Sequence, residues 1–284
     1  MSPYRKHIVI VGSARSGTSW FSELIALQHR YRMLFEPEHE FNTKHGKLIC
    51  DRYLTVNNSS DNINAYLKKV FANRVDCDWI AQISNRKWKR HLWPFVPKKY
   101  IIKFVRCNLS AHYLATHFKI PVVYITRNPY EVIASQQRVK FPWLYDLSWF
   151  QSQEDLCDLL LENYDFDIKK QNKISNLEKL CIRWCIENSI PFLQNDRTAA
   201  FEIYKYEEFK NNMNFFLEFC KLHNLKPLDD IETTFTNPSS KTHPKSNIIT
   251  GESKALILAK DDYQIINKYL DIFEINLYDR KTSV

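Results

Sequence analysis

Residues 12–20, Gly-Ser-Ala-Arg-Ser-Gly-Thr-Ser-Trp, are the stretch that decides the fold of this chain. Residues 7–11, His-Ile-Val-Ile-Val, precede them, and their β-branched side chains favour a strand that is buried on both faces. After them, apolar residues recur at helical spacing through residue 27. The order of strand, glycine-bounded turn and helix is typical of the start of an α/β fold.

The turn has the composition of an anion-binding loop. Such a turn directs backbone N–H groups toward one point at a helix N-terminus, where the unpaired donors and the positive dipole end attract a phosphate group. The spacing within residues 12–17 matches the first half of the pattern G-x-x-x-x-G-K-[ST], but Thr18 occupies the lysine position and Ser19 follows it. Nucleoside triphosphatases use that lysine on their β- and γ-phosphates, so its absence argues against γ-phosphoryl transfer. Arg15 places a cation in the loop instead.

Composition bounds the kind of protein. With 284 residues, of which 44% are hydrophobic, the chain can bury a sizeable core as one large domain or two small ones. No internal repeat or linker stands out. We therefore expect one domain over residues 1–284, with a loop-rich insertion at about 42–60 and a helical region at about 141–193. The net charge of +8 favours an anionic ligand: nucleic acid, an acidic glycan or a nucleotide donor.

The cysteines and the N-terminus indicate a cytoplasmic protein. Seven cysteines, an odd number without a C-x-x-C pair, are typical of reduced core thiols, and Cys181 and Cys185 are expected to be packing residues. No apolar run long enough for a signal peptide or a membrane anchor precedes the first strand. No metal-ligand spacing occurs, so no metal is expected.

Charged residues follow a second predicted strand, residues 32–35. Glu36, Glu38, His39 and Glu40 come directly after it, at the edge where parallel sheets collect ligands and catalytic groups. A carboxylate here is expected near the anion loop. For Glu38 and Glu40, a solvated loop charge is the favoured interpretation.

Two further predicted strands end in cations. Residues 100–106 form the third strand, with Lys103 inside its apolar run and Arg106 at its end, where a buried cation needs an anionic partner. Residues 121–126 form the fourth strand, and Arg127 follows it directly. Pro129 suits the first turn of the next helix, so Arg127 and Ser135 are placed to bind a second phosphate; a surface ion pair is the alternative for Arg127.

The remaining pattern is mostly scaffold. Arg183 and Glu187 have the spacing of a surface ion pair on a long helix. A polar loop at 236–246 is either a flap over an anion or a linker, and the basic, aromatic run at 85–93 suits either phosphate and sugar contacts or a solvated face. Helices are predicted at 61–72, capped by Asp61, and at 108–117, 176–192 and 261–273, with a last strand at 199–204.

Taken together, these signatures resemble the sulfotransferases that use 3′-phosphoadenosine 5′-phosphosulfate (PAPS), in particular the bacterial branch related to carbohydrate sulfotransferases. The resemblance covers most of the chain. It assigns the 5′-phosphosulfate to Arg15, Ser16, Gly17, Thr18 and Ser19. The run 125–135, Ile-Thr-Arg-Asn-Pro-Tyr-Glu-Val-Ile-Ala-Ser, is similar to the family's 3′-phosphate signature and assigns that phosphate to Arg127 and Ser135.

Three further segments carry the resemblance. Residues 34–37, Leu-Phe-Glu-Pro, are similar to the segment that supplies the base in carbohydrate-type members, which favours Glu36 over Glu38 and His39. Tyr206 and Glu207 look like the pair whose ring lies near the adenine. Residues 238–242 are similar to the late donor-binding loop, although the Arg-Lys-Gly of cytosolic members is absent. The loop residues given to the donor are Ser240, Lys241 and Thr242.

The resemblance implies an enzyme with a single P-loop-like α/β domain, in which helices flank a central, mostly parallel sheet. An acceptor hydroxyl, expected on a glycan or glycolipid, attacks sulfur while Glu36 takes its proton. Arg15 and the loop N–H groups stabilise the charge on the leaving phosphate, with Lys103 as a helper. No nucleic acid partner is expected.

Two other functions fit parts of the pattern. A P-loop kinase or nucleoside triphosphatase requires the lysine that Thr18 replaces. A non-catalytic binder of nucleic acid or acidic glycan leaves Glu36 and the pair of Arg127 and Ser135 unexplained. The acceptor, the oligomeric state and the choice between Glu36 and His39 as base stay open.

Overall fold

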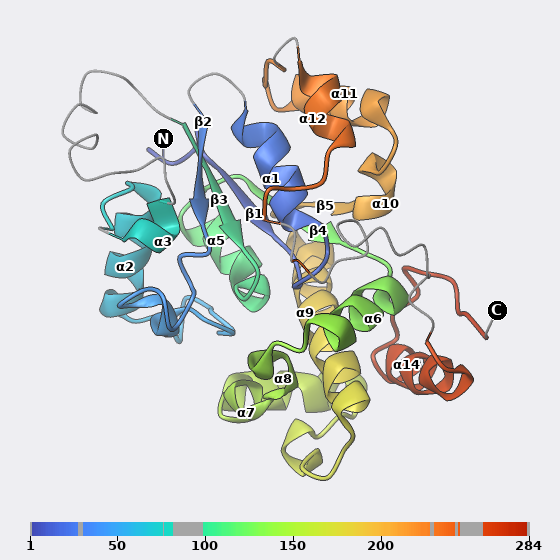
Figure 1. Ribbon diagram of the computed structural model, residues 1–284. Coiled ribbons are helices and arrows are strands. Elements are labelled where there is room, and N and C mark those ends of the chain that lie inside the picture. The colour runs from blue at the N-terminus through green and yellow to red at the C-terminus, as the bar shows by residue number, and fades with distance from the viewer. Residues whose placement is uncertain are drawn as a thin grey trace.

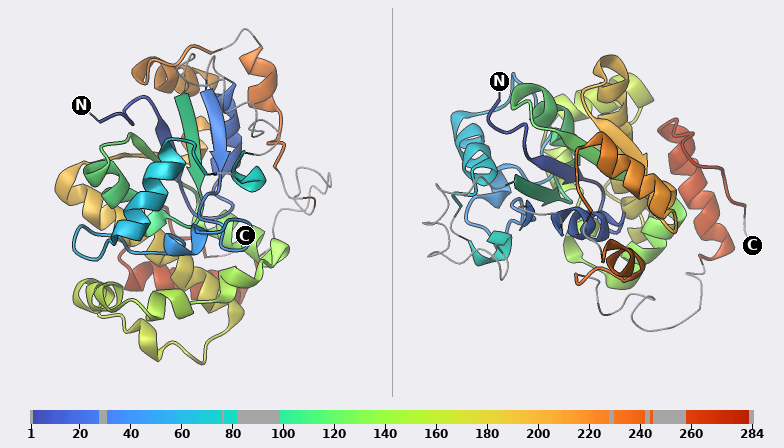
Figure 2. Two further views of the ribbon diagram at one scale, coloured as in Figure 1. Left: turned by 90° about the vertical axis from the view of Figure 1, so that its left-hand side faces the viewer. Right: turned by 90° about the horizontal axis from the view of Figure 1, so that it is seen from above.

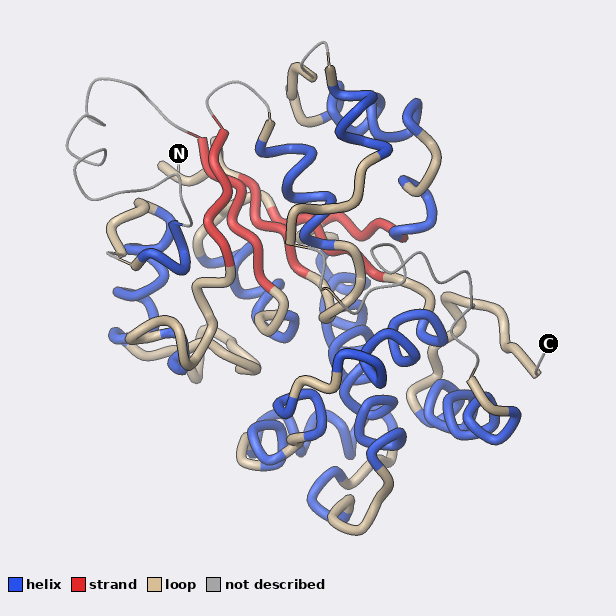
Figure 3. Tube along the Cα trace, in the orientation of Figure 1, coloured by secondary structure: helices blue, strands red, loops and turns tan. Residues whose placement is uncertain are grey.

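A computed structural model describes residues 2–27, 31–75, 77–81, 99–227, 230–241, 244 and 258–282. Its strands form one five-stranded sheet in the order β2-β3-β1-β4-β5, and every neighbouring pair is parallel (Figures 1 and 3). The predicted α/β class is therefore confirmed. The strands are β1 Ile8–Val11, β2 Tyr31–Phe35, β3 Lys99–Phe104, β4 Val122–Thr126 and β5 Glu202–Lys205.

Helices cover both faces of the sheet (Figures 1 and 2), and α7 and α8 lie at the opposite end of the molecule from α11 and α12. The α-helices are α1 Thr18–Ala26, α2 Asp61–Phe71, α3 Asp78–Ala81, α5 Ala111–His117, α6 Pro129–Val139, α7 Ser148–Gln151, α8 Glu154–Tyr164, α9 Asn176–Thr198, α10 Tyr206–Phe209, α11 Met213–Leu222, α12 Ile231–Thr236 and α14 Lys260–Ile272. Short 3₁₀ helices are η1 Gly46–Leu48, η4 Asn108–Ser110, η5 Pro142–Tyr145 and η6 Ile168–Lys170.

Alternation along the strands explains why both faces are covered. In β1, Ile8 and Ile10 pack with side chains of α1, α11 and α12, whereas Val9 and Val11 pack with side chains of α2 and α5. All four are buried. An apolar run without polar alternation is what a strand between two helical layers requires.

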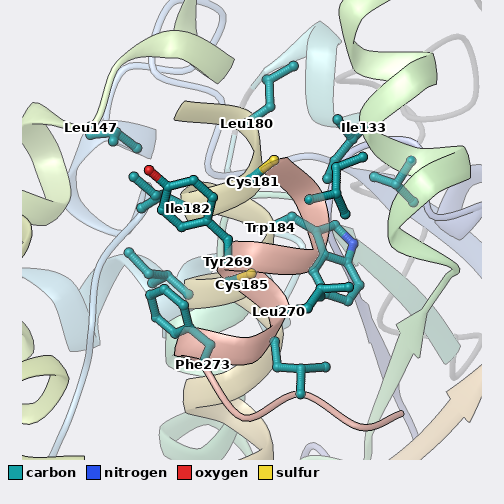
Figure 4. Close-up of a cluster of buried hydrophobic side chains, with 14 of the residues drawn as sticks. Ile133, Leu147, Leu180, Cys181, Ile182, Trp184, Cys185, Tyr269, Leu270 and Phe273 are labelled. Atoms are coloured by element: carbon teal, nitrogen blue, oxygen red, sulfur yellow. The ribbon is translucent and has the colours of Figure 1, made fainter. Parts of the chain in front are cut away.

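A third apolar cluster lies outside the sheet, between α6, α8, α9 and α14. Figure 4 shows Trp184 and Cys185 of α9 beside Tyr269 and Leu270 of α14. The Trp184 side chain is fully buried. The cluster holds α9, and with it the polar side chains described below, in a fixed position under the site.

Several predicted boundaries differ from the structure. Ser60, not Asp61, caps α2, because its hydroxyl accepts the N–H of Ile63. β3 ends at Phe104, so Arg106 lies in the loop after it. β5 begins at Glu202, since residue 199 instead ends α9 in the left-handed conformation. The loop-rich 42–60 segment contains only η1.

All seven cysteines are free thiols, and six of them are buried; Cys77 is half-buried. Cys181 and Cys185 belong to the apolar cluster of α9, as expected for packing residues. In the part of the chain that the structure describes, no helix combines the length and the apolar character needed to cross a bilayer.

Candidate active site

The carboxyl ends of the strands open into one cavity of about 1530 Å³. β1 lies between β3 and β4. From β1 the chain continues to β2 and β3 on one side of the sheet, and then to β4 and β5 on the other. Ligands of open parallel sheets bind at such a switch point. The predicted site residues that line the cavity are Arg15, Gly17, Thr18, Ser19, Glu36, Lys103, Arg127, Ser135, Tyr206, Ser240 and Lys241.

The turn between β1 and α1 has no room for side chains at its glycines. Gly17 has φ +89°, and a Cβ atom there would lie 2.4 Å from the ring of Tyr206. A Cβ atom on Gly12 would lie 2.3 Å from the carbonyl oxygen of Ile125 in β4. The loop is thus pressed against both β4 and the start of α10, which leaves its backbone at the cavity surface.

The N-terminus of α1 fits an anion. Gly17 is its N-cap and provides no side-chain hydrogen bond to the first turn, so the N–H groups of the helix start keep their donor capacity. Thr18 and Ser19 line the cavity next to it. Ser16 was predicted with them, but its side chain is fully buried and does not line the cavity, and its Oγ has no hydrogen-bond partner among the described residues.

The turn after β4 meets the turn after β1. The Nε of Arg15 donates to Ser135 Oγ at 2.9 Å, and an Nη of Arg127 donates to the carbonyl of Arg15 at 3.3 Å. Arg127 also pairs with Glu131 at 2.5 Å, and its guanidinium lies 4.6 Å from the centre of the Tyr206 ring. The two turns predicted to bind phosphates therefore point into the same cavity.

Positive charge accumulates at this meeting point. Burial, and then the charges of Arg127 and Arg138, lower the pKa of Arg15. Like charges held close together disfavour the charged forms, so an anion bound among them is stabilised. Backbone N–H groups at the start of α1 and the arginine side chains beside it can both bind a phosphorylated ligand.

Glu36 and Lys103 form an ion pair on the other side of the loop. The Lys103 ammonium lies 2.5 Å from Glu36 Oε1, and the lysine side chain is only 2% exposed. β2 and β3 pair in parallel with Phe35 opposite Lys103, so the strand register itself sets the two side chains together. Glu36 has φ +43°, a left-handed conformation that turns the chain directly after β2.

Glu38 and Glu40 are not solvated loop charges, and that interpretation is wrong. Glu38 is 1% exposed, and its Oε1 accepts the N–H groups of Val105 at 2.7 Å and Arg106 at 3.1 Å. Burial, and then the charge of Glu36, raise the pKa of Glu38 to about 7. Glu40 accepts a hydrogen bond from Arg106 at 2.7 Å, which supplies the partner that a cation after β3 needs.

His39 is held by its own loop. Its Nδ1 accepts the N–H groups of Phe41 and Asn42 at 3.3 Å, and its Nε2 lies 3.2 Å from the Asn42 side-chain amide. Burial lowers its pKa, and its ring packs on Trp79 at 4.7 Å. His39 lines the cavity together with Glu36.

Sequence reasoning missed the role of α9 under the site. Asn188 donates to Ser13 Oγ at 3.1 Å and accepts from Thr126 Oγ1 at 2.9 Å, which joins the end of β1 to the end of β4. From α6, Gln136 donates to the carbonyl of Ala14 at 3.0 Å. The signal available in the sequence was a polar Glu-Asn pair on the apolar side of a long helix.

The predicted surface pair of Arg183 and Glu187 is also corrected. Both side chains are buried, and Arg183 lies 3.2 Å from Glu187 and 3.2 Å from Asp51. Asp51 in turn pairs with Arg106 at 2.5 Å. Burial raises the pKa of Glu187 to about 7. A connected charge network thus lies beneath the cavity rather than on the surface.

The late loop reaches the cavity in part. Ser240 donates through its N–H and its hydroxyl to Glu23 of α1, at 2.9 and 2.5 Å. The Lys241 ammonium lies 5.6 Å from the Phe35 ring. Thr242 and the basic, aromatic run at 85–93 lie outside the described residues. Within the described ranges, no group of three or more histidine, cysteine or acidic side chains could hold a metal ion.

No protein-family model matches the chain, and no curated protein matches it. Solved structures do. The sulfotransferase domain from the curacin biosynthetic pathway is 12% identical with a TM-score of 0.49, covering 96% of this chain and 98% of that one. The sulfotransferase domain of the Synechococcus PCC 7002 olefin synthase is 15% identical with a TM-score of 0.47, covering 96% and 94%.

Mouse sulfotransferase SULT7A1, whose crystal structure is a complex with PAP, is 11% identical with a TM-score of 0.44, covering 97% of this chain and 86% of that one. At such identities the activity of a chain follows from its own side chains and not from its neighbours. The chain is similar in backbone to sulfotransferases along nearly its whole length.

Proposed function

We propose that the protein is a sulfotransferase that moves the sulfuryl group of PAPS to an acceptor hydroxyl. One observation carries the proposal: Arg15, from the turn after β1, and Ser135, from the helix after β4, meet at 2.9 Å in the cavity that also contains the Glu36–Lys103 pair. A donor with phosphates at both ends of an adenosine needs two phosphate-binding sites in one cavity. Transfer to a hydroxyl also needs a base to take its proton.

The side chains divide between the two ends of the donor. Arg15 and the N–H groups at the start of α1 would hold the 5′-phosphosulfate, with Thr18 and Ser19. Arg127 and Ser135 would hold the 3′-phosphate. The adenine would lie near Tyr206, whose ring is 5.7 Å from that of Trp20. When bound, the donor supplies an activated sulfuryl group. From the late loop, the residues assigned to the donor are Ser240, Lys241 and Thr242.

Side chains and backbone groups of the chain have three roles in the proposed reaction. Glu36 accepts the proton of the acceptor hydroxyl while a bond forms between that oxygen and sulfur and the bond between sulfur and the bridging oxygen breaks. Arg15 and the loop N–H groups stabilise the negative charge that develops on the leaving phosphate. Lys103 holds the Glu36 carboxylate in place through their 2.5 Å ion pair and adds positive charge beside the reacting atoms.

For the acceptor we propose a hydroxyl of a glycan or glycolipid. Phe35, Trp79, Phe141 and Trp143 line the cavity together with Glu36. Aromatic faces of this kind pack on the apolar faces of sugar rings while a carboxylate binds their hydroxyls. Transfer of labelled sulfate to components of cell extracts, followed by identification of the labelled product, tests the acceptor class.

The donor proposal is tested by ligand-dependent melting. Adenosine 3′,5′-bisphosphate (PAP) should raise the melting temperature of the protein, and adenosine triphosphate should raise it much less, because only PAP carries a phosphate for Arg127 and Ser135. Arg127→Ala should remove most of the PAP shift. Equal shifts from the two nucleotides, or none, would refute the donor assignment and favour a kinase or a simple anion binder.

A further inference from the structure

The charges that line the cavity are unbalanced. Among the described residues, eight cationic and four acidic side chains line it. Three of the acids are engaged: Glu36 with Lys103, Glu131 with Arg127, and Glu38 with backbone N–H groups. The fourth, Glu232, belongs to α12.

Arg138 has no acid. It lines the cavity from the last turn of α6 and is half-buried, and within the described ranges it forms no hydrogen bond or ion pair. It lies seven residues after Glu131 and three after Ser135, so the three side chains share one face of the helix. A half-buried guanidinium that pairs with no acidic side chain is unusual, because the ion pair that would offset its desolvation is missing.

The path of α6 places Arg138 on the acceptor side of the cavity. α6 begins directly after β4, and Trp143, four residues beyond its end, packs on Arg106 after β3, with 4.6 Å between the guanidinium and the ring centre. β1 lies between β4 and β3 in the sheet. The helix therefore crosses the edge of the sheet above the turn after β1, where Ser135 meets Arg15.

Arg138 lies one helical turn past that crossing. It lines the cavity together with Glu36, Trp143 and Phe141. On α6 it lies about two helical turns beyond Glu131, whose partner Arg127 packs on the Tyr206 ring near the proposed adenine position. Its charge is close enough to Arg15 to lower the pKa of that residue. An anion bound here would relieve the repulsion between the two guanidinium groups.

We infer that Arg138 is the binding site for an anionic group on the acceptor, so that the enzyme sulfates a hydroxyl of an acidic glycan rather than of a neutral one. This inference rests on the proposed function, since it takes Glu36 to mark the acceptor hydroxyl. The planar guanidinium fork binds a carboxylate or a sulfate through two parallel hydrogen bonds. Trp143 and Phe141 flank the same position and contact the sugar ring.

A matched pair of probes tests the inference. 4-Nitrophenyl β-glucuronide and 4-nitrophenyl β-glucoside differ only in a carboxylate in place of a hydroxymethyl group. Titrated calorimetrically into the complex with PAP, the glucuronide should bind the wild-type protein about tenfold more tightly, as expected for one charge-assisted arginine–carboxylate pair. Arg138→Gln should abolish this preference, and Arg138→Lys should keep part of it.

A control variant removes the same charge nearby. Lys140→Gln changes an exposed lysine two residues further on and should leave the preference unchanged. The inference fails if the wild-type protein binds both probes alike or binds neither, or if Arg138→Gln retains the preference. It also fails if Arg138→Gln weakens PAP binding tenfold, because the arginine then belongs to the donor.

The outcome is separable from that of the proposed function. Loss of the PAP melting shift in the wild-type protein refutes the donor, and the same titration without PAP then still reports whether Arg138 selects the carboxylate. The melting temperature of Arg138→Gln shows that the variant is folded.

Discussion

At the scale of single residues, the proposed reaction depends on which group takes the proton. The register of β2 against β3 places Phe35 opposite Lys103 and so brings Glu36 to the lysine ammonium. His39 is engaged by backbone N–H groups of its own loop. The position of each side chain, more than its intrinsic basicity, therefore separates the two candidates.

Glu36→Gln should abolish turnover without affecting the donor. We expect kcat for transfer of labelled sulfate to fall by about 10²–10⁴, the usual contribution of a general base, while the Kd for PAP changes little. His39→Asn is the control and should keep most of the activity. If the activities of the two variants are reversed, His39 is the base.

Gly17→Ala should weaken both the fold and the site. The left-handed backbone costs an alanine about 1–2 kcal/mol, and the added Cβ would meet the Tyr206 ring at 2.4 Å. We expect a lower melting temperature and weaker PAP binding. The double variant Gly17→Ala/Tyr206→Leu should recover the part of the loss in melting temperature that comes from the ring. Unchanged melting and PAP binding in the single variant would contradict this account of the loop.

The sequence predicts the site residues that come directly after strands and fails for those whose partners are far away. Arg15, Glu36 and Arg127 follow strand ends, and parallel strands bring their carboxyl ends to one edge. Glu38 looked like a loop charge because its partners, the N–H groups of Val105 and Arg106, are 67 and 68 residues away. When segments distant in the sequence bury a side chain, the residues next to it in the sequence show no pattern that predicts its burial.

At the scale of elements, α9 is the helix whose burial the local sequence pattern predicts least well. The i, i+4 spacing of Arg183 and Glu187 is typical of a surface pair, yet Arg183 is fully buried and contacts Asp51. By contrast, the positions of the strands and of α6 and α14 follow from apolar periodicity and from Pro129. Periodicity predicts where a helix lies but does not show how many of its faces other elements cover.

Arg183→Ala should be among the most destabilising substitutions in the chain. It leaves Asp51 and Glu187 as buried acids without this partner, and removing one member of a buried ion pair typically costs about 3–5 kcal/mol. Arg197→Ala, at an exposed position of the same helix, should change stability by no more than about 0.5 kcal/mol. Urea denaturation compares the two. Equal stabilities of the two variants would show that the ion pairs of Arg183 do not stabilise the folded protein.

At the scale of the whole molecule, two buried groups give stability opposite dependences on pH. The pKa of Glu38 is raised to about 7 by burial, so the folded state holds a proton that the unfolded state releases above about 4.5. Its contribution is present at low pH and is lost as pH rises through 7. The pKa of His7 is lowered to about 3, again chiefly by burial, so its contribution is present above about 6.5 and is lost as pH falls toward 3.

Glu38→Gln separates the two effects. The difference in the free energy of unfolding between the variant and the wild-type protein should shift in favour of the variant by about 2–3 kcal/mol between pH 5 and pH 8. His7 contributes equally to both proteins and cancels. Urea denaturation at the two pH values measures the shift, and a pH-independent difference would mean that Glu38 titrates normally.

The distribution of the thiols provides a direct count of unfolded molecules. Six cysteines are buried and the seventh, Cys77, is half-buried with its thiol turned to the carbonyl of Asn42. A maleimide reagent should therefore modify intact protein slowly and at one position, and denatured chains at seven. Mass spectrometry of partly alkylated samples would then show two populations with few species between them if opening of the molecule is all-or-none.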